Sequence, residues 1–273
     1  MSASTRWKVP RSVLAPFGKI LIFLLIWGLL YAPLLVPFLS LGVVYAEVVG
    51  AITMLATVWI VRTLIERRRF SSIGFERDRV AANLAKGLAL GTAMMVTLVA
   101  IDVAARCGDV QPARLDPAVV AAAALATIAN TLVQEVLVRG YVQQTLERSF
   151  GIRAAVLLSS LIFTLLHAPA LHAFLPALNI FLAGILLGTA AAVTGNLWLP
   201  WAIHFGWNFV QGPIFGLVMS GNGSWASRRI VVLHGPRLMT GGPFGIEGSV
   251  TASIVTMAAI IVVGRWRGRR AIT

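Results

Sequence analysis

Long apolar stretches alternate with short polar or basic segments along nearly the whole chain. Many of the stretches approach the ~20 residues that a helix needs to cross the hydrocarbon core of a bilayer. Eight spans are predicted, at about 18–39, 42–64, 85–105, 118–146, 152–168, 173–194, 197–219 and 249–264. The pattern indicates an all-α fold, a polytopic bundle of transmembrane helices.

Proline and glycine divide the second half of this pattern. Pro169 predicts the end of the fifth span near Ala168, because proline lacks an amide donor and disfavours helix in the residue before it. Gly195 and Asn196 predict a turn before the seventh span. No internal repeat or low-complexity linker interrupts the sequence, so residues 1–273 are predicted to form one integral membrane domain.

Composition and charge placement agree with a membrane protein. Hydrophobic residues make up 58% of the chain and charged residues 12%, with a mean hydropathy of +0.85. The net charge of +13 does not indicate nucleic-acid binding, because the basic residues cluster at the ends of apolar runs. Cytoplasmic loops of membrane proteins carry an excess of Lys and Arg. The basic segments 1–17, 62–86, 148–153 and 265–273 therefore predict that both termini are cytoplasmic.

A stripe of polar groups follows one face of the fourth span. Its members recur about once per helical turn: Thr127, Asn130, Thr131, Gln134, Glu135 and Arg139. Glu135 and Arg139 are i,i+4 neighbours, so an ion pair between them is geometrically available. The pair could belong to a catalytic site, or it could only fix a helix end with Arg139 reaching to water.

Two histidines also lie in apolar, membrane-length stretches. His167 ends the fifth apolar run, and His204 lies in the seventh with Asn208 one turn later. Each imidazole alone is more simply explained as a hydrogen-bonded core residue. Polar groups on three separate spans instead favour a shared site. The set suits hydrolysis, since a carboxylate can activate water, imidazoles can orient it, and an amide can hold developing negative charge.

The other ionisable residues in or near the spans have simpler interpretations. His172 and His234 are predicted to be surface or capping residues. Glu47 and Asp102 are intramembrane acids without clear partners in the sequence, and Asp102 is expected to be wet at the outer end of its span. The single Cys107 excludes an intramolecular disulfide and a cysteine-based metal cluster.

Three motifs resemble the CAAX-protease and bacteriocin-processing family of intramembrane proteases, also called the Abi family. The family pattern is Glu-Glu-x-x-x-Arg, Phe-x-x-x-His and His-x-x-x-Asn, each on its own helix. The matching positions are Gln134-Glu135-x-x-x-Arg139, Phe163-x-x-x-His167 and His204-x-x-x-Asn208. The resemblance covers about residues 118–250 and includes the segments 195–200 and 238–248.

One position departs from the family pattern. Gln134 replaces the first glutamate, the usual candidate for activating water, and an amide has no useful basicity. Glu135 remains, but adjacent helix residues point about 100° apart. Either Glu135 serves as the base, or the protein is catalytically weakened or silent.

The resemblance implies an intramembrane endopeptidase with its site between the fourth, fifth and seventh spans. Glu135 would be the carboxylate, held ionised by Arg139. The remaining predicted site residues would position water or a metal, steady the oxyanion, or donate a hydrogen bond: His167, His204, Asn208 and Gln134. The family is described as metal-dependent and as glutamate-dependent, so a divalent metal such as zinc on His167, His204 and Glu135 is one alternative.

The implied surroundings are a lipid bilayer, with membrane-associated peptides or proteins as substrates. The resemblance further implies the plasma membrane of a bacterium. Two other functions fit parts of the sequence. One is a non-catalytic scaffold or immunity-type protein that binds peptides, which Gln134 favours. The other is a transporter with a proton path through Glu47, Asp102 and Glu135, against which stands the absence of repeat symmetry.

Overall fold

The computed structural model describes residues 13–223 and 229–266, apart from the side chain of Leu39. Its α-helices are α1 (Ala15–Leu35), α2 (Val43–Trp59), α3 (Val80–Ala104), α4 (Pro117–Glu135), α5 (Gln144–Phe150), α6 (Ile152–Leu165), α7 (Phe174–Thr194), α8 (Trp198–Phe209), α9 (Arg237–Thr240) and α10 (Val250–Gly264). Three π-helical segments extend them: η2 (Ile60–Ile65), η4 (Val136–Gln143) and η6 (Val210–Ile214). Short 3₁₀ helices connect several of the others: η1 (Val36–Leu41), η3 (Phe70–Ile73), η5 (Ala168–His172), η7 (Gly242–Phe244) and η8 (Ile246–Gly248).

The helices form an all-α bundle of membrane type, as the sequence predicts. Five helical segments in the described residues are long and apolar enough to cross a membrane: Ala15–Phe38, Val43–Ile65, Val80–Ala104, Pro117–Phe150 and Phe174–Thr194. Two further apolar helices, α6 and α10, are shorter. The count of eight spans and the side of each terminus stay predictions. The basic segment 1–17 lies largely, and the tail 265–273 mostly, outside the described residues.

Several predicted boundaries differ from the observed helices. The third helix begins at Val80, and the fourth continues through η4 and α5 to Phe150. The seventh ends at Ile214 rather than 219. Helix α6 ends at Leu165, shortly before Pro169, as proline predicts. At the other end of α4, the Asp116 side chain accepts a hydrogen bond from the Ala118 amide at 2.8 Å and caps the helix.

Two regions that lie between predicted spans contain regular structure. Strand β1 (Gly108–Val110) pairs antiparallel with β2 (Val231–Leu233), with Asp109 opposite Val232. The long segment after the seventh helix also contains α9, η7 and η8. Backbone polar groups need partners wherever they are buried, and these elements supply them.

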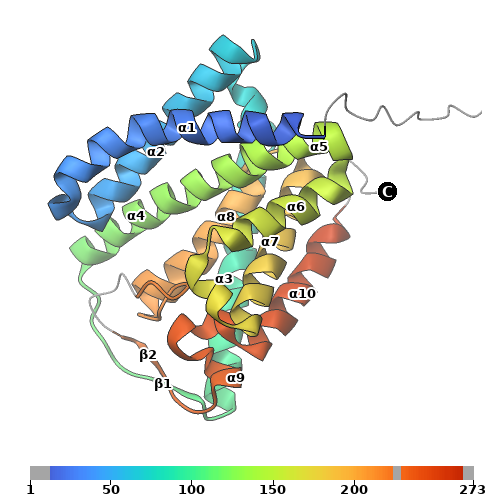
Figure 1. The fold of residues 1–273 in the computed structure, drawn as a ribbon. Coiled ribbons are helices and arrows are strands. Elements are labelled where there is room, and N and C mark those ends of the chain that lie inside the picture. Colours follow the sequence, from blue (N-terminus) through green and yellow to red (C-terminus); the bar gives the residue numbers. More distant parts are fainter. Residues whose placement is uncertain (1–12, 224–228, 267–273) are drawn as a thin grey trace, which may run out of the picture.

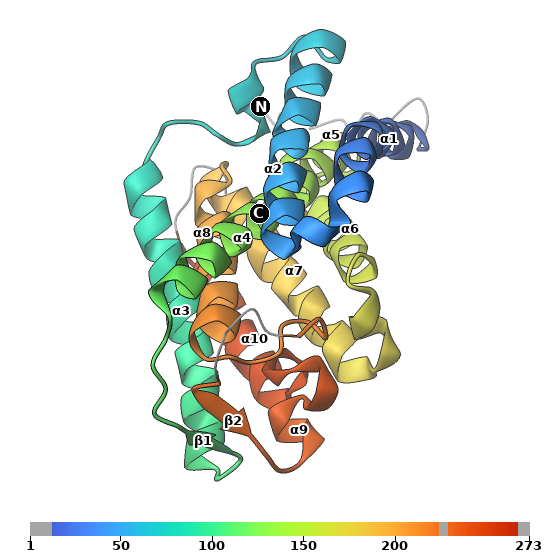
Figure 2. The ribbon, with the colours of Figure 1, turned by 90° about the vertical axis from the view of Figure 1, so that its left-hand side faces the viewer.

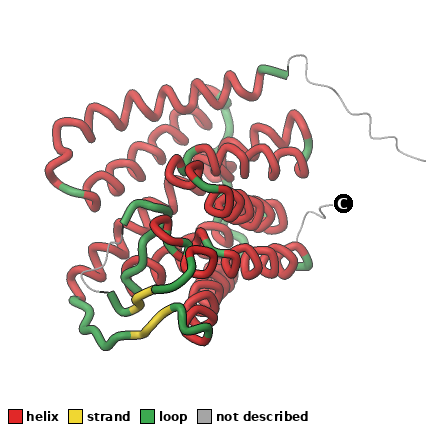
Figure 3. Tube along the Cα trace, turned by 60° about the horizontal axis from the view of Figure 1, so that its bottom comes forward, coloured by secondary structure: helices red, strands yellow, loops and turns green. Residues whose placement is uncertain are grey.

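Helix α4 runs across the molecule beneath α1, and the strands and α9 lie at the opposite end from α1 (Figure 1). Helices α1 and α2 lie to one side of the other helices, and α3 lies along α8 (Figure 2). Figure 3 shows that most of the described chain is helix, joined by loops, with the two short strands near one end. Helix α7 packs against α6, α8 and α10, so it occupies the centre of the bundle.

Two glycines on α3 seat the short helix α8. A Cβ on Gly91 would lie 2.2 Å from the Ile203 carbonyl oxygen, and one on Gly87 would lie 2.7 Å from that of Leu199. Small residues at such spacing let two helix backbones approach closely in a membrane. Because His204 follows Ile203 on α8, this contact fixes the depth and rotation of that histidine.

Candidate functional site

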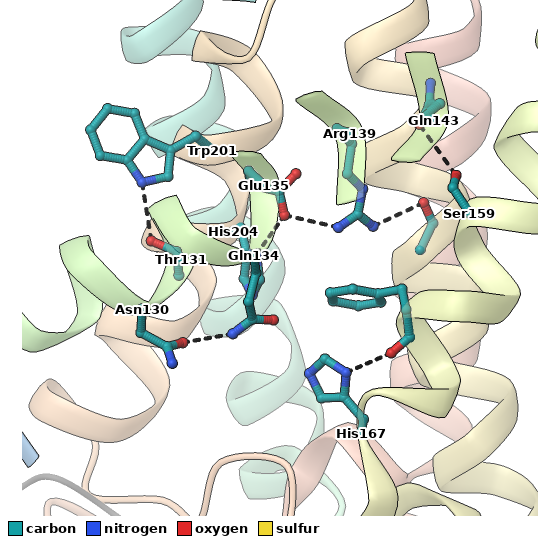
Figure 4. Close-up of polar contacts among 12 residues, drawn as sticks. Asn130, Thr131, Gln134, Glu135, Arg139, Gln143, Ser159, His167, Trp201 and His204 are labelled. Atoms are coloured by element: carbon teal, nitrogen blue, oxygen red, sulfur yellow. Dashed lines mark hydrogen bonds and ion pairs between the residues drawn. The ribbon is translucent and has the colours of Figure 1, made fainter. Parts of the chain in front are cut away.

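Glu135 is the central residue of the site, at the junction between α4 and η4. Its Oε1 accepts a hydrogen bond from Arg139 Nη1 at 3.0 Å and one from His204 Nδ1 at 2.8 Å. All three side chains are buried, and Figure 4 shows them converging from α4, η4 and α8. The second oxygen, Oε2, has no hydrogen-bond partner among the described residues. The i,i+4 ion pair that the sequence made available is thus formed.

The Glu135 bond sets the tautomer of His204. A carboxylate without a proton only accepts hydrogen bonds, so we infer that Nδ1 of His204 carries the proton. In a neutral imidazole the other nitrogen, Nε2, is then an acceptor. His204 lines a cavity, so this acceptor is available to a molecule held there.

Arg139 ties the site to two more helices. Its Nη2 donates to the Gly184 carbonyl oxygen on α7 at 3.2 Å, and its guanidinium lies 4.2 Å from the centroid of the Phe163 ring on α6. Burying an ion pair costs desolvation energy that further hydrogen bonds must offset. Arg139 also lines a second, polar cavity of about 380 Å³, together with Arg68 and Arg148.

His167 lies just beyond the end of α6, where the chain leaves the helix. Its Nδ1 is 2.8 Å from the Phe163 carbonyl oxygen, and the two rings are 4.4 Å apart between centroids. The Phe163 ring is also 6.0 Å from that of His204. Phe163 therefore contacts both imidazoles and fixes the spacing between them.

One cavity brings three of the predicted site residues together. It has a volume of about 60 Å³, and its walls include His167, His204 and Asn208. One water molecule needs roughly 10–15 Å³ measured this way, so the cavity has room for a few. Glu135 and Arg139 do not line it and lie behind His204. No hydrogen bond of the Asn208 side chain to another described residue is observed.

Gln134 is turned toward α2 rather than toward His204. Its Nε2 donates to Asn130 Oδ1 at 2.7 Å, and the Asn130 side chain is hydrogen-bonded to Glu47. Figure 4 shows the Gln134 amide beside Asn130. The Gln134 Oε1 atom is buried and has no hydrogen-bond partner among the described residues. Glu47 thus has a partner that the sequence did not indicate.

The burial of Asp102 differs from the prediction. Its side chain is fully buried, not wet, and neither oxygen has a hydrogen-bond partner among the described residues. The fold of the β1–β2 region over the end of α3 explains this burial. His172 is exposed, and His234 forms an exposed pair with Asp109 at 3.0 Å, so both lie apart from the cavity.

Glu247 is a cavity residue to which the sequence analysis gave no role. Trp207 Nε1 donates to its Oε1 at 3.1 Å, and the Ser220 amide and Oγ donate to its Oε2 at 2.5 and 3.0 Å. Burial raises the pKa of Glu247, while the hydrogen bonds from Ser220, Gln211 and Trp207 oppose that rise. The available signal was one acidic residue in the glycine-rich segment 238–248, which resembles the family.

Asn179 on α7 holds the backbone around Glu247 in place. Its Nδ2 donates to the carbonyl oxygens of Glu247 and Ser249 at 2.7 and 2.8 Å, and Ser253 Oγ donates to its Oδ1 at 2.6 Å. The turn η8 is therefore bound to α7 and α10 through one buried amide. This arrangement fixes the position of the Glu247 carboxylate at the cavity wall.

The zinc alternative requires three ligands around one point. Within residues 13–223 and 229–266, no group of three or more His, Cys, Asp or Glu side chains is arranged to hold a metal ion. His204 uses Nδ1 to bind Glu135, and His167 uses Nδ1 at the Phe163 carbonyl. The described side chains thus do not gather the three ligands that this alternative needs.

Comparison with known families agrees with the motifs. Residues 116–210 match the Rce1-like family, described as type II CAAX prenyl endopeptidase Rce1-like. The matched segment contains Glu135, Arg139, His167, His204 and Asn208, and it confirms the predicted resemblance to CAAX proteases. The search of curated proteins gave no match, and neither did the search of solved structures.

The match and the apolar helices together define the class of this protein. It is an integral membrane protein with a segment that is similar to an endopeptidase family. Glu247 lies outside the matched segment, as do α1, α2 and α3. The matched segment therefore covers the helices that carry Glu135, Arg139, His204 and Asn208.

Proposed function

We propose that this protein is an intramembrane endopeptidase that hydrolyses peptide bonds of membrane-associated peptides or proteins. The observation that carries the proposal is the 2.8 Å bond between Glu135 and His204, with His204 in the wall of the cavity that His167 and Asn208 also line. The reaction would take place in that cavity, with water as the nucleophile.

In this proposal Glu135 acts through His204. The carboxylate holds the Nδ1–H of His204, which leaves Nε2 to accept a hydrogen bond from water. A carboxylate plays the same orienting role toward histidine in hydrolytic triads. Arg139 keeps Glu135 ionised and in place. Glu135 would not itself contact the water, because it does not line the cavity.

The other predicted residues have supporting roles. The Nδ1 atom of His167 is already bound to a backbone carbonyl. His167 would therefore orient the water through its other ring nitrogen. The Asn208 amide would donate to the carbonyl oxygen as it gains negative charge, an interaction that stabilises the transition state. Gln134 would support the site through its hydrogen bond to Asn130, because it does not line the cavity.

Replacing His204 tests the activity. His204→Ala should lower cleavage of a membrane-tethered fluorogenic peptide by about 10²–10⁴-fold, the usual contribution of acid–base catalysis. His234→Ala, at an exposed histidine, is the matched control and should retain activity. Melting temperatures in detergent establish that both variants are folded. A folded His204→Ala protein with native activity would overturn the proposal.

A silent peptide-binding protein is the second candidate, and Gln134 is the observation that favours it. Under the proposed activity, Gln134→Glu should raise the cleavage rate, because a second carboxylate would join the site. Neither protein would cleave any member of a broad peptide panel under the alternative. A tethered peptide would still bind in a His204-dependent way, as measured by fluorescence anisotropy.

We further propose that all eight predicted spans lie in the membrane, with both termini cytoplasmic in a bacterial plasma membrane. The positive segments at the chain ends and at 62–86 support this orientation. Reporter fusions after Arg69 and Arg270 should both read cytoplasmic, and one near Arg228 should read external. Arg228 and Arg270 lie outside the described residues. Opposite readings at the two basic segments would refute the eight-span orientation.

A further inference from the structure

The cavity contains a carboxylate that the family motifs do not supply. Among the described residues in its wall, the ionisable ones are His167, His204 and Glu247. Glu135 lies behind His204, and Gln134 has an amide where the family has its first carboxylate. Glu247 is thus the acidic side chain that shares the cavity with both histidines.

The hydrogen bonds of Glu247 favour its charged form and fix it at the wall of the cavity. An ionised carboxylate has about four lone-pair sites for hydrogen bonds. One donor reaches Oε1 from Trp207, and two reach Oε2 from Ser220. The Gln211 side chain also hydrogen-bonds to this carboxylate, so donors from α8, η6 and the Ser220 turn hold it at the cavity wall. Trp207 and His204 are both on α8, so the same helix positions the carboxylate and the imidazole.

We propose that the Glu247 carboxylate accepts the proton of the water that attacks the substrate, the task of the carboxylate absent at Gln134. This inference rests on the proposed endopeptidase activity and assigns its base. His204 then orients the water, while Glu247 changes its protonation state. The turn η8, outside the family match, thereby supplies a group to a site otherwise built from α4, α6 and α8.

The proposed reaction conserves atoms and charge. The water oxygen forms a bond to the peptide carbonyl carbon, one water proton moves to Glu247, and the carbonyl electrons move to the carbonyl oxygen beside Asn208. The tetrahedral intermediate then reforms its carbonyl as the C–N bond breaks. The proton on Glu247 moves to the leaving nitrogen, which departs as an amine and restores the carboxylate.

A structural clamp is the competing role for Glu247. Its hydrogen bonds to Trp207 and Ser220 also join the Ser220 turn to α8, and their loss could displace the cavity wall. A clamp and a base differ in their response to pH. A base must be ionised, so activity falls as pH drops through the pKa of Glu247. The ionisable neighbours are His204 on α8 and His167 after α6; α3, α7 and α10 add none among the described wall residues.

Glu247→Gln tests the role of the carboxylate in the full-length protein. It keeps the size of the side chain, and it should lower kcat by about 10²–10⁴-fold if Glu247 is the base. Glu247→Asp should restore part of the activity. Glu76→Gln, at an exposed acid, is the matched control and should match the native enzyme. Melting temperature in detergent reports whether each variant is folded.

Ser220→Ala tests whether activity depends on the ionisation of Glu247. It removes one donor to the Glu247 carboxylate, which destabilises the anion and raises the pKa of Glu247. The acidic limb of the kcat/KM profile should therefore move to higher pH. If Glu247→Gln does not fold, the pH shift in Ser220→Ala is the remaining test. An acidic limb at the same pH as in the native enzyme then overturns the inference. A folded Glu247→Gln enzyme within threefold of native also overturns it. If His204→Ala is fully active as well, the endopeptidase site itself fails.

Discussion

Helices α1 and α7 are of equal length but differ in hydrophobicity and in burial. Helix α1 is the more hydrophobic of the two, yet only 11% of the residues in its most apolar stretch are buried, against 56% in α7. In a soluble protein the more apolar helix would be expected inside. A bilayer reverses this expectation, because lipid chains solvate apolar side chains as well as protein does. High hydropathy in this chain therefore indicates contact with lipid.

Small and polar residues distinguish the buried helix. A Cβ on Gly184 of α7 would lie 2.8 Å from that of Ser160 on α6, so these helices touch closely. The Gly184 carbonyl oxygen accepts a hydrogen bond from Arg139. Asn179 of the same helix donates a hydrogen bond to the backbone of the turn at Glu247. The interior of this bundle is thus specified by close approach and hydrogen bonds. Three substitutions test that contrast.

The largest effect is expected at the buried ion pair. Arg139→Met leaves the Glu135 carboxylate buried without its cation, which costs about 3–5 kcal/mol of stability. The double variant Glu135→Gln/Arg139→Met should recover a large part of the loss. Exposed Arg153→Met is the control, expected within about 0.5 kcal/mol of native. Reversible unfolding in mixed micelles measures all of these. Equal losses for Arg139 and Arg153 would refute the importance of the buried pair.

A smaller loss is expected at the α3–α8 contact. Gly91→Ala adds a methyl group 2.2 Å from a backbone oxygen, so the helices must separate, at about 1–3 kcal/mol. Gly28→Ala on α1, where nothing lies within 4 Å, should be neutral or stabilising because alanine favours helix. The same unfolding assay compares them. If Gly91→Ala is as well tolerated as Gly28→Ala, close packing does not seat α8.

The smallest effect is expected on the outer face of α1. Leu29 is 75% exposed, and Leu29→Ala should change stability by less than about 0.5 kcal/mol. The expected result in mixed micelles is an unfolding curve that overlaps the native one. A large loss there would instead indicate that another protein surface covers this face of α1.

The sequence could predict what depends on local periodicity. The polar stripe on α4 and the His204–Asn208 spacing each follow from one helix, and the Glu135–Arg139 pair formed as its spacing allowed. The sequence could not predict contacts between segments that are distant along the chain. The bond from Glu135 to His204 depends on how α8 packs, and the bond from Asn130 to Glu47 depends on how α2 packs against α4. Glu247 gave no periodic signal at all, since a turn between α9 and α10 carries it.

The chain of bonds from His204 through Glu135 to Arg139 connects the walls of two cavities. Such a chain would conduct protons if every member could release one. Arginine cannot, because its guanidinium stays protonated at any pH a protein survives. Arg139 therefore blocks proton transfer along this series of hydrogen bonds. If the protein is the hydrolase proposed above, water in the His204 cavity would have no path for protons through this chain to the second cavity.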